Sequence, residues 1–66
     1  MTSAFIQGRH AALGDAVMMR HLECVARFFW LKEHVIDEEF MAGYEEGLRD
    51  AYGRLFEEAL SVAKEF

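Results

Sequence analysis

The side chains best suited to metal chemistry in this sequence are three histidines and one cysteine. His21 and Cys24 are three residues apart, so a helix would place them on one side, as in half of a zinc site. No second pair with suitable spacing follows, and His10 and His34 lie several turns away. Only a symmetric dimer would bring two such pairs together. We therefore interpret Cys24 as a small apolar core residue and expect no metal and no cofactor.

Residue types used in catalysis are present, but their spacing does not make them converge. The adjacent carboxylates Glu38-Glu39, Glu45-Glu46 and Glu57-Glu58 would point about 100° apart on a helix, which is unsuitable for an acid and base pair. The two serines, Ser3 and Ser61, lie near the ends of the chain. No nucleophile elbow, phosphate-binding loop or zinc-protease motif occurs. The sequence predicts a protein without enzymatic activity.

Composition restricts the class of protein further. The 66 residues are 53% hydrophobic and carry a formal charge of −5, so we expect one folded domain whose charge repels nucleic acid. The single cysteine excludes an intrachain disulfide. Residues 1–9 lack a basic segment leading into an apolar run, and no apolar stretch is long enough to cross a bilayer. We expect a cytoplasmic protein that makes no membrane contact.

The apolar residues that must position these side chains recur every three or four residues, as on amphipathic helices. Residues 3–34 are predicted to form one helix, capped by Thr2 or Ser3. The pair Gly14-Asp15 leaves open an alternative in which one helix ends there and another begins. Asp37 precedes two carboxylates, a pattern typical of a helix N-terminus, so we place a turn at 35–37 and a second helix over 38–65. These elements form a single all-α domain, residues 1–66.

Two long helices joined by so short a turn must lie antiparallel, as a helical hairpin. A lone hairpin buries one face, and without a disulfide or a metal the remaining stabiliser of so small a chain is oligomerisation. The predicted fold is therefore a homodimeric four-helix bundle. Its dimer interface would be formed by residues of the apolar stripes and one glycine: Met18, Leu22, Val25, Phe29, Gly47, Leu48 and Leu55.

Small residues spaced by four occur in the second predicted helix, at Gly43, Gly47 and Ala51. This spacing lets the backbone of another helix approach closely. Residues 42–52 resemble in composition the glycine-repeat helices of flagellar export regulators. That resemblance implies close helix pairing and no particular activity.

The predicted outer faces of the two helices carry opposite charge. Arginines and His34 fall on one line of the first helix, whereas carboxylates dominate the second. One interpretation is an ordinary solvated surface, and the other is a contact with an acidic partner or with RNA phosphates. Aromatic residues and arginine are enriched in protein interfaces, and burial in the dimer core is the alternative for the aromatics. The residues predicted to bind a partner are Arg20, Arg27, Trp30, Tyr44, Arg49, Tyr52 and Phe56.

By architecture, this hairpin resembles two groups of small regulators. One contains the Rop-like plasmid copy-number regulators, and this resemblance implies RNA phosphates bound at Arg20, Arg27 and Lys32. The other contains phage-encoded proteins that disable host regulators, such as quorum-sensing activators and CRISPR complexes. It implies a non-enzymatic inhibitor or anti-activator of a host regulatory protein, encoded by a phage or mobile element. We favour this second reading, because the negative charge of the chain disfavours RNA. A third reading is a structural or secretion-type adaptor that works by helix pairing.

Overall fold

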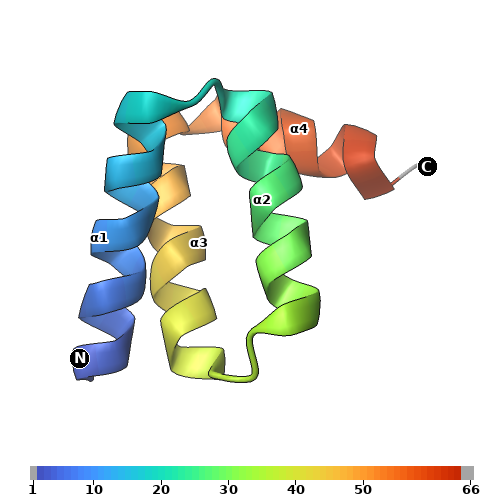
Figure 1. The fold of residues 1–66 in the computed structure, drawn as a ribbon. Coiled ribbons are helices and arrows are strands. Elements are labelled where there is room, and N and C mark those ends of the chain that lie inside the picture. The colour runs from blue at the N-terminus through green and yellow to red at the C-terminus, as the bar shows by residue number, and fades with distance from the viewer. Residues whose placement is uncertain (1, 65–66) are drawn as a thin grey trace.

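The computed structural model describes residues 2–64, and within this range the chain forms four helices. They are α1 (Ser3–Met18), α2 (His21–His34), α3 (Glu38–Tyr52) and α4 (Arg54–Lys64). Helices α1, α2 and α3 lie alongside one another, and α4 runs across the end at which α1 meets α2 (Figure 1). The all-α class is confirmed. The four helices come from one chain, whereas the homodimer of hairpins stays a prediction.

The helix expected over 3–34 is interrupted at Met19 and Arg20, which are both extended. The interruption lies beyond Gly14, which is inside α1, so the alternative break at Gly14-Asp15 is wrong as well. A tertiary contact stabilises this interruption. The Tyr52 hydroxyl lies 3.0 Å from the carbonyl oxygen of Met19 and 3.2 Å from that of Ala16, and it donates to these unpaired acceptors at the end of α1.

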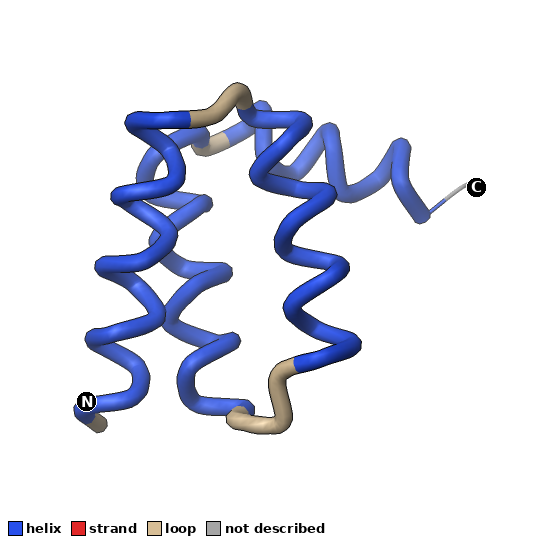
Figure 2. The backbone as a smooth tube through the Cα atoms, viewed as in Figure 1, coloured by secondary structure: helices blue, strands red, loops and turns tan. Residues whose placement is uncertain are grey.

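The turn between α2 and α3 lies at residues 35–37, as the sequence predicts. The Asp37 carboxylate accepts hydrogen bonds from the backbone N–H groups of Glu39 (3.0 Å) and Phe40 (3.1 Å), which makes Asp37 the N-cap. At the start of α1, the Thr2 hydroxyl accepts from the N–H of Phe5 in the same way. Figure 2 shows how short the turn between α2 and α3 is. Helices α2 and α3 are therefore antiparallel neighbours, as in the predicted hairpin.

The helix expected over 38–65 is also interrupted, at Gly53. This residue has φ 55° and ψ −122°, a conformation that is strained for any residue with a Cβ atom. Its carbonyl oxygen accepts from the N–H groups of Phe56 (3.1 Å) and Glu57 (3.4 Å), so α4 starts in a new direction. The apolar period continues across Gly53, which is why the pattern alone predicts one uninterrupted helix.

Helices α1 and α3 run parallel and touch through glycine. A Cβ atom on Gly8 would collide with the backbone of Phe40, and one on Gly43 would collide with the backbone of Phe5. A Cβ atom on Gly47 would lie 2.7 Å from the Cβ of Ala12 and 2.8 Å from the carbonyl oxygen of Arg9. The close pairing predicted from the glycine spacing is thus confirmed, within one chain.

The core lies where all four helices meet. Its centre is aromatic: the ring of Phe28 stacks at 6.4 Å on Tyr44 and meets Phe56 edge-on at 5.9 Å. Apolar residues from each helix complete it, and they are Ala12, Cys24, Val25, Leu31, Leu48, Ala59 and Leu60. Among residues 2–64, no helix has both the length and the apolar content that crossing a membrane requires.

Candidate functional site

A groove of about 420 Å³ lies between the C-terminal half of α2 and the N-terminal half of α3. Phe28 is its one buried lining residue, and Val35, Met41 and Glu45 are half-buried. Lys32, Ile36, Glu38 and Ala42 complete the lining. The groove has the volume of a ligand-binding site and is mostly apolar.

Charge is distributed unevenly around this groove. Glu38 and Glu45 stand on the α3 side, and Lys32 on the α2 side lies 6.0 Å from the centre of the Phe28 ring. The Glu45 carboxylate accepts a hydrogen bond from Arg49 at 2.7 Å, and Arg49 also binds Glu57 on α4. Arg49 therefore offsets the charge of Glu45, and Glu38 supplies the remaining negative charge of the lining.

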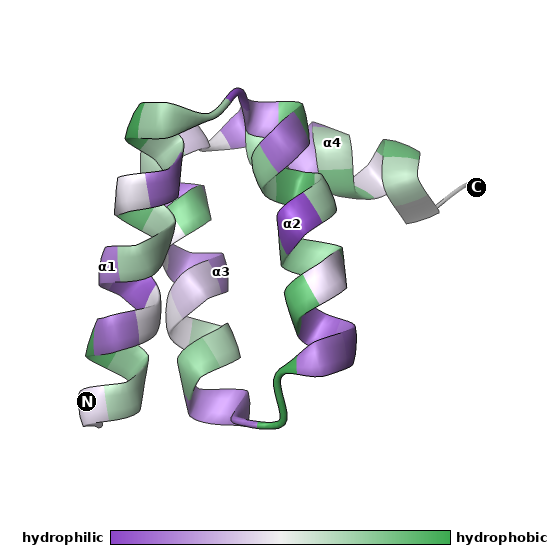
Figure 3. Ribbon diagram, viewed as in Figure 1, coloured by the Kyte–Doolittle hydropathy of each residue, from purple (hydrophilic) through white to green (hydrophobic). Residues whose placement is uncertain are grey.

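A second apolar surface lies at the opposite end of α2, where α1 passes into α2. Val17 and Met18 are each 83% exposed and Leu22 is 62% exposed. Leu55, half exposed, follows the nearby junction of α3 and α4. Figure 3 shows the apolar end of α1 and, at the far turn, an apolar segment followed by the hydrophilic start of α3. We call Val17, Met18 and Leu22 the apolar corner.

The aromatic residues predicted to bind a partner differ in how far they are buried. Tyr44 and Phe56 are fully buried, so the prediction that they anchor a partner is wrong. Tyr52 is half-buried, and its hydroxyl is engaged at the end of α1. Trp30 alone of the four is largely exposed, at 55%. Its ring stacks on that of His34 with centroids 4.2 Å apart, and His34 Nδ1 donates to its carbonyl oxygen.

The arginines predicted to face a partner are mostly ion-paired within the chain. Arg27 Nε lies 2.9 Å from Asp15 on α1, and Arg9 on α1 binds Asp50 on α3. Arg49 binds two glutamates, which raise its pKa above its usual value through hydrogen bonding. Arg20 is exposed at the start of α2. The basic line predicted along the first helix is therefore largely neutralised.

The residues of the predicted dimer interface also include both buried and exposed side chains. Val25, Gly47 and Leu48 are buried within the chain, so they are not available to a second copy. Phe29 is half-buried beside Phe28, with ring centroids 5.5 Å apart. The remaining three residues, Met18, Leu22 and Leu55, are exposed. The physical reason is that α1 packs on Gly47 of α3 and α4 covers the aromatic core beside α2, so the chain closes its own core.

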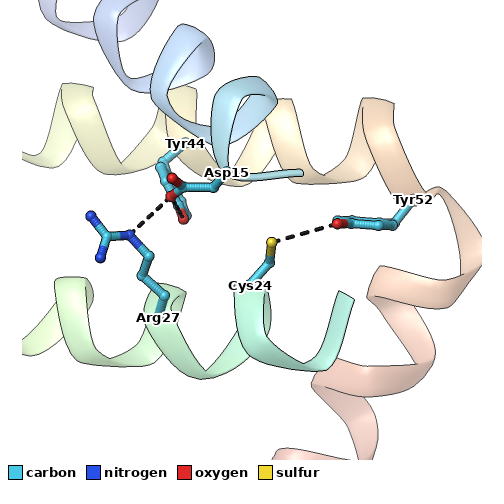
Figure 4. A network of polar contacts seen from close by, with 5 residues as sticks. All are labelled: Asp15, Cys24, Arg27, Tyr44 and Tyr52. Atoms are coloured by element: carbon cyan, nitrogen blue, oxygen red, sulfur yellow. Dashed lines mark hydrogen bonds and ion pairs between the residues drawn. The ribbon is translucent and has the colours of Figure 1, made fainter. Parts of the chain in front are cut away.

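A polar network joins three helices beside the core (Figure 4). The carboxylate of Asp15 on α1 accepts from the Tyr44 hydroxyl at 2.6 Å and from Arg27 Nε at 2.9 Å. The thiol of Cys24 lies 3.5 Å from the Tyr52 hydroxyl. Since the Tyr52 proton is directed to carbonyl oxygens, the thiol is the donor in this contact. These groups hold α1 against α2 and α3.

The residues considered for metal binding are not brought together. The His21 ring lies 6.0 Å from that of Tyr52, and Cys24 is enclosed in the core. Within residues 2–64, no three histidine, cysteine or carboxylate side chains gather closely enough to hold an ion.

The sequence contained one signal for the α1 surface that the periodicity argument did not use. Ala4, Gly8, Ala12 and Ala16 are spaced by four, like the glycines of α3. Two matching stripes of small residues indicate that their helices pair closely. The groove had no such signal, because it depends on how far α2 stands from α3.

Comparison with known proteins gives no relative: no protein family, curated protein or solved structure matches this chain.

Proposed function

We propose that this chain is a non-enzymatic protein-binding regulator, which acts as an inhibitor or anti-activator of a regulatory protein. The observation that supports this best is the amount of large apolar surface left open after the core has closed. Ile36 is 96% exposed, the apolar corner is mostly exposed, and Trp30 is half exposed. Apolar patches of this kind on small proteins usually mark protein contacts.

Two observations count against the alternatives. RNA binding would use arginines to neutralise phosphates, but Arg9 and Arg27 already bind carboxylates of the same chain. A helix-pairing adaptor would use the small-residue stripe of α3, but Gly43 and Gly47 already pack against α1. Protein binding through apolar side chains requires neither these arginines nor the small-residue stripe of α3.

Affinity capture with four baits tests the proposal: wild type, Trp30→Ala, Met18→Glu and Ile36→Glu. Each variant alters one exposed surface without touching a buried residue, and Ser61→Glu on the exposed side of α4 is the control. We expect one protein to be retained by wild type and by the control, and to be lost from at least one variant. The retained protein, once purified, should bind directly and lose activity in proportion to its occupancy.

The proposal fails if nothing is retained above the background of an empty matrix. It also fails if every variant retains the same protein equally, because retention would then be independent of the apolar surface. A complex that dissociates steeply as salt is raised and contains RNA would support the nucleic-acid alternative instead.

A further inference from the structure

We propose that the groove between α2 and α3 binds a short cationic amphipathic helix of a partner protein. This inference rests on the proposed protein-binding function, and it adds the site and the chemistry of the segment that occupies it.

The shape of the groove favours a helix as occupant. Its α3 side extends from Glu38 to Glu45, which is about 10 Å, or two helical turns. Lys32, Glu38 and Ala42 on its walls are exposed, so the groove is open to solvent along its length. An open apolar groove between two helices suits a third helix that inserts residues spaced by three or four.

The floor of the groove suits apolar anchors. Phe28 is buried at its base and Met41 is half-buried beside it, and methionine adapts its shape to different partners. Ile36, at the end of the groove, is 96% exposed although it is among the most hydrophobic residue types. An occupant would remove this side chain from water, which gives binding an apolar driving force.

Charge determines which kind of helix fits. Residues 32–39 hold one lysine and four carboxylates, a balance of −3 out of the −5 of the whole chain. Of these carboxylates, Glu38 lines the groove, Glu33 and Asp37 are exposed near it in the chain, and Glu39 accepts a hydrogen bond from Thr2 at the start of α1. Glu45, farther along the groove, is bound by Arg49. A segment with lysine or arginine on the side of its apolar stripe that faces α3 would meet Glu38 there, while Lys32 stands on the α2 side.

A second copy of this chain is a poorer occupant. Two copies carry −5 each, so the acidic groove would face an acidic protein. The apolar face of α4, formed by Phe56, Ala59 and Leu60, is already buried in its own core.

The test uses a designed fluorescent peptide of about 14 residues, with leucines spaced by three and four and lysines elsewhere. Its binding is followed by fluorescence anisotropy at low salt. A control peptide has glutamate in place of every lysine. We expect micromolar binding of the lysine peptide, and none of the glutamate peptide at the same concentrations.

Two pairs of variants locate the site. Ala42→Phe fills the groove, whereas Ala26→Phe adds the same volume at an exposed position of α2 outside it. Glu38→Gln removes a groove charge, whereas Glu46→Gln removes one elsewhere on α3. We expect Ala42→Phe to weaken binding roughly tenfold, and Glu38→Gln to weaken it roughly two- to fivefold. Both controls should bind like wild type, and circular dichroism checks that all four variants are folded.

Three results would overturn the inference: no binding of the lysine peptide to wild type, equal binding by Ala42→Phe, or equal binding of both peptides. Any of these leaves the proposed function standing if the captured partner is still lost from Met18→Glu or Trp30→Ala. The proposed function fails separately, through the capture experiment.

Discussion

Among single residues, Asp15 has the largest structural role outside the apolar core. Its carboxylate receives the hydroxyl of Tyr44 and the guanidinium of Arg27, so it connects three helices. Tyr44 is fully buried, and a buried hydroxyl without a partner is costly. The sequence indicates Asp15 only as an alternative helix cap, because its partners lie 12 and 29 positions away.

We therefore predict that Asp15→Ala lowers the free energy of unfolding by about 1–3 kcal/mol. Urea denaturation followed by circular dichroism measures this change. Glu46→Ala, which removes an exposed carboxylate from α3, is the control and should change stability by less than about 0.5 kcal/mol. Equal stability of the two variants would mean that the Asp15 network contributes nothing.

The two tyrosines predict a loss of stability at high pH. Burial raises the pKa of Tyr52 to about 12, and burial with the bond to Asp15 raises the pKa of Tyr44 further. In the unfolded chain both groups titrate near pH 10. The stabilising contribution is thus complete below pH 10 and is lost as pH rises toward 12 and beyond.

We expect the midpoint of urea unfolding to fall as pH is raised above 10. Tyrosinate absorbance should show both groups titrating well above pH 10 in the folded protein. The variant Tyr52→Phe should keep one high titration and show a weaker dependence of stability on pH. Titration of both tyrosines near pH 10 in folded protein would contradict the buried network.

On the scale of helices, the decisive contact is the parallel pairing of α1 and α3. Gly8 and Gly43 each lie against backbone atoms of the facing helix. A methyl group at either position would therefore fit only if the two helices moved apart. Gly47 packs between Arg9 and Ala12 in the same pairing. Gly14, also in a helix interior, has no atom near its missing Cβ. Gly14 is therefore a matched control for substitutions at Gly8 and Gly43.

Gly8→Ala and Gly43→Ala should each lower stability by about 3 kcal/mol or more, which is enough to unfold many small domains. Gly14→Ala should raise stability by about 0.5–1 kcal/mol, because alanine is the better helix former. Thermal unfolding of the three variants gives the comparison. A Gly8→Ala protein as stable as Gly14→Ala would exclude the close packing. Gly47 also packs against α1 of its own chain, so we expect Gly47→Leu to disrupt the fold of the single chain and not only the association of two chains.

For the molecule as a whole, the dimensions are those of a compact domain. The radius of gyration is 11.0 Å, and a compact domain of this length has about 10.8 Å. The sequence predicts a homodimer because a two-helix hairpin buries one face only. The structure has two further interruptions, at Met19–Arg20 and at Gly53, and they let α4 cover the aromatic core.

We predict that folding does not depend on dimerisation. The midpoint of thermal unfolding should be constant over a roughly hundredfold range of protein concentration. Light scattering coupled to size exclusion should give the mass of one chain, 7.6 kDa. A midpoint that rises with concentration would instead support the homodimer, with Met18, Leu22 and Leu55 as its remaining exposed residues.

Local signals in the sequence were sufficient to determine the helical class, the N-cap at Asp37, the turn at 35–37 and the close pairing through Gly43 and Gly47, and they left Thr2 and Ser3 as alternatives for the first N-cap. Each depends on residues within one or two helical turns of each other, whose capping and packing preferences act over that range. Only the tertiary structure decided where the helices are interrupted, which helix the glycines meet, and which aromatics remain exposed. Tyr52 completes the end of α1 from 33 positions away, and Phe56 reaches the core because α4 turns at Gly53. Such contacts depend on the path of the whole chain, so helical periodicity alone does not contain them.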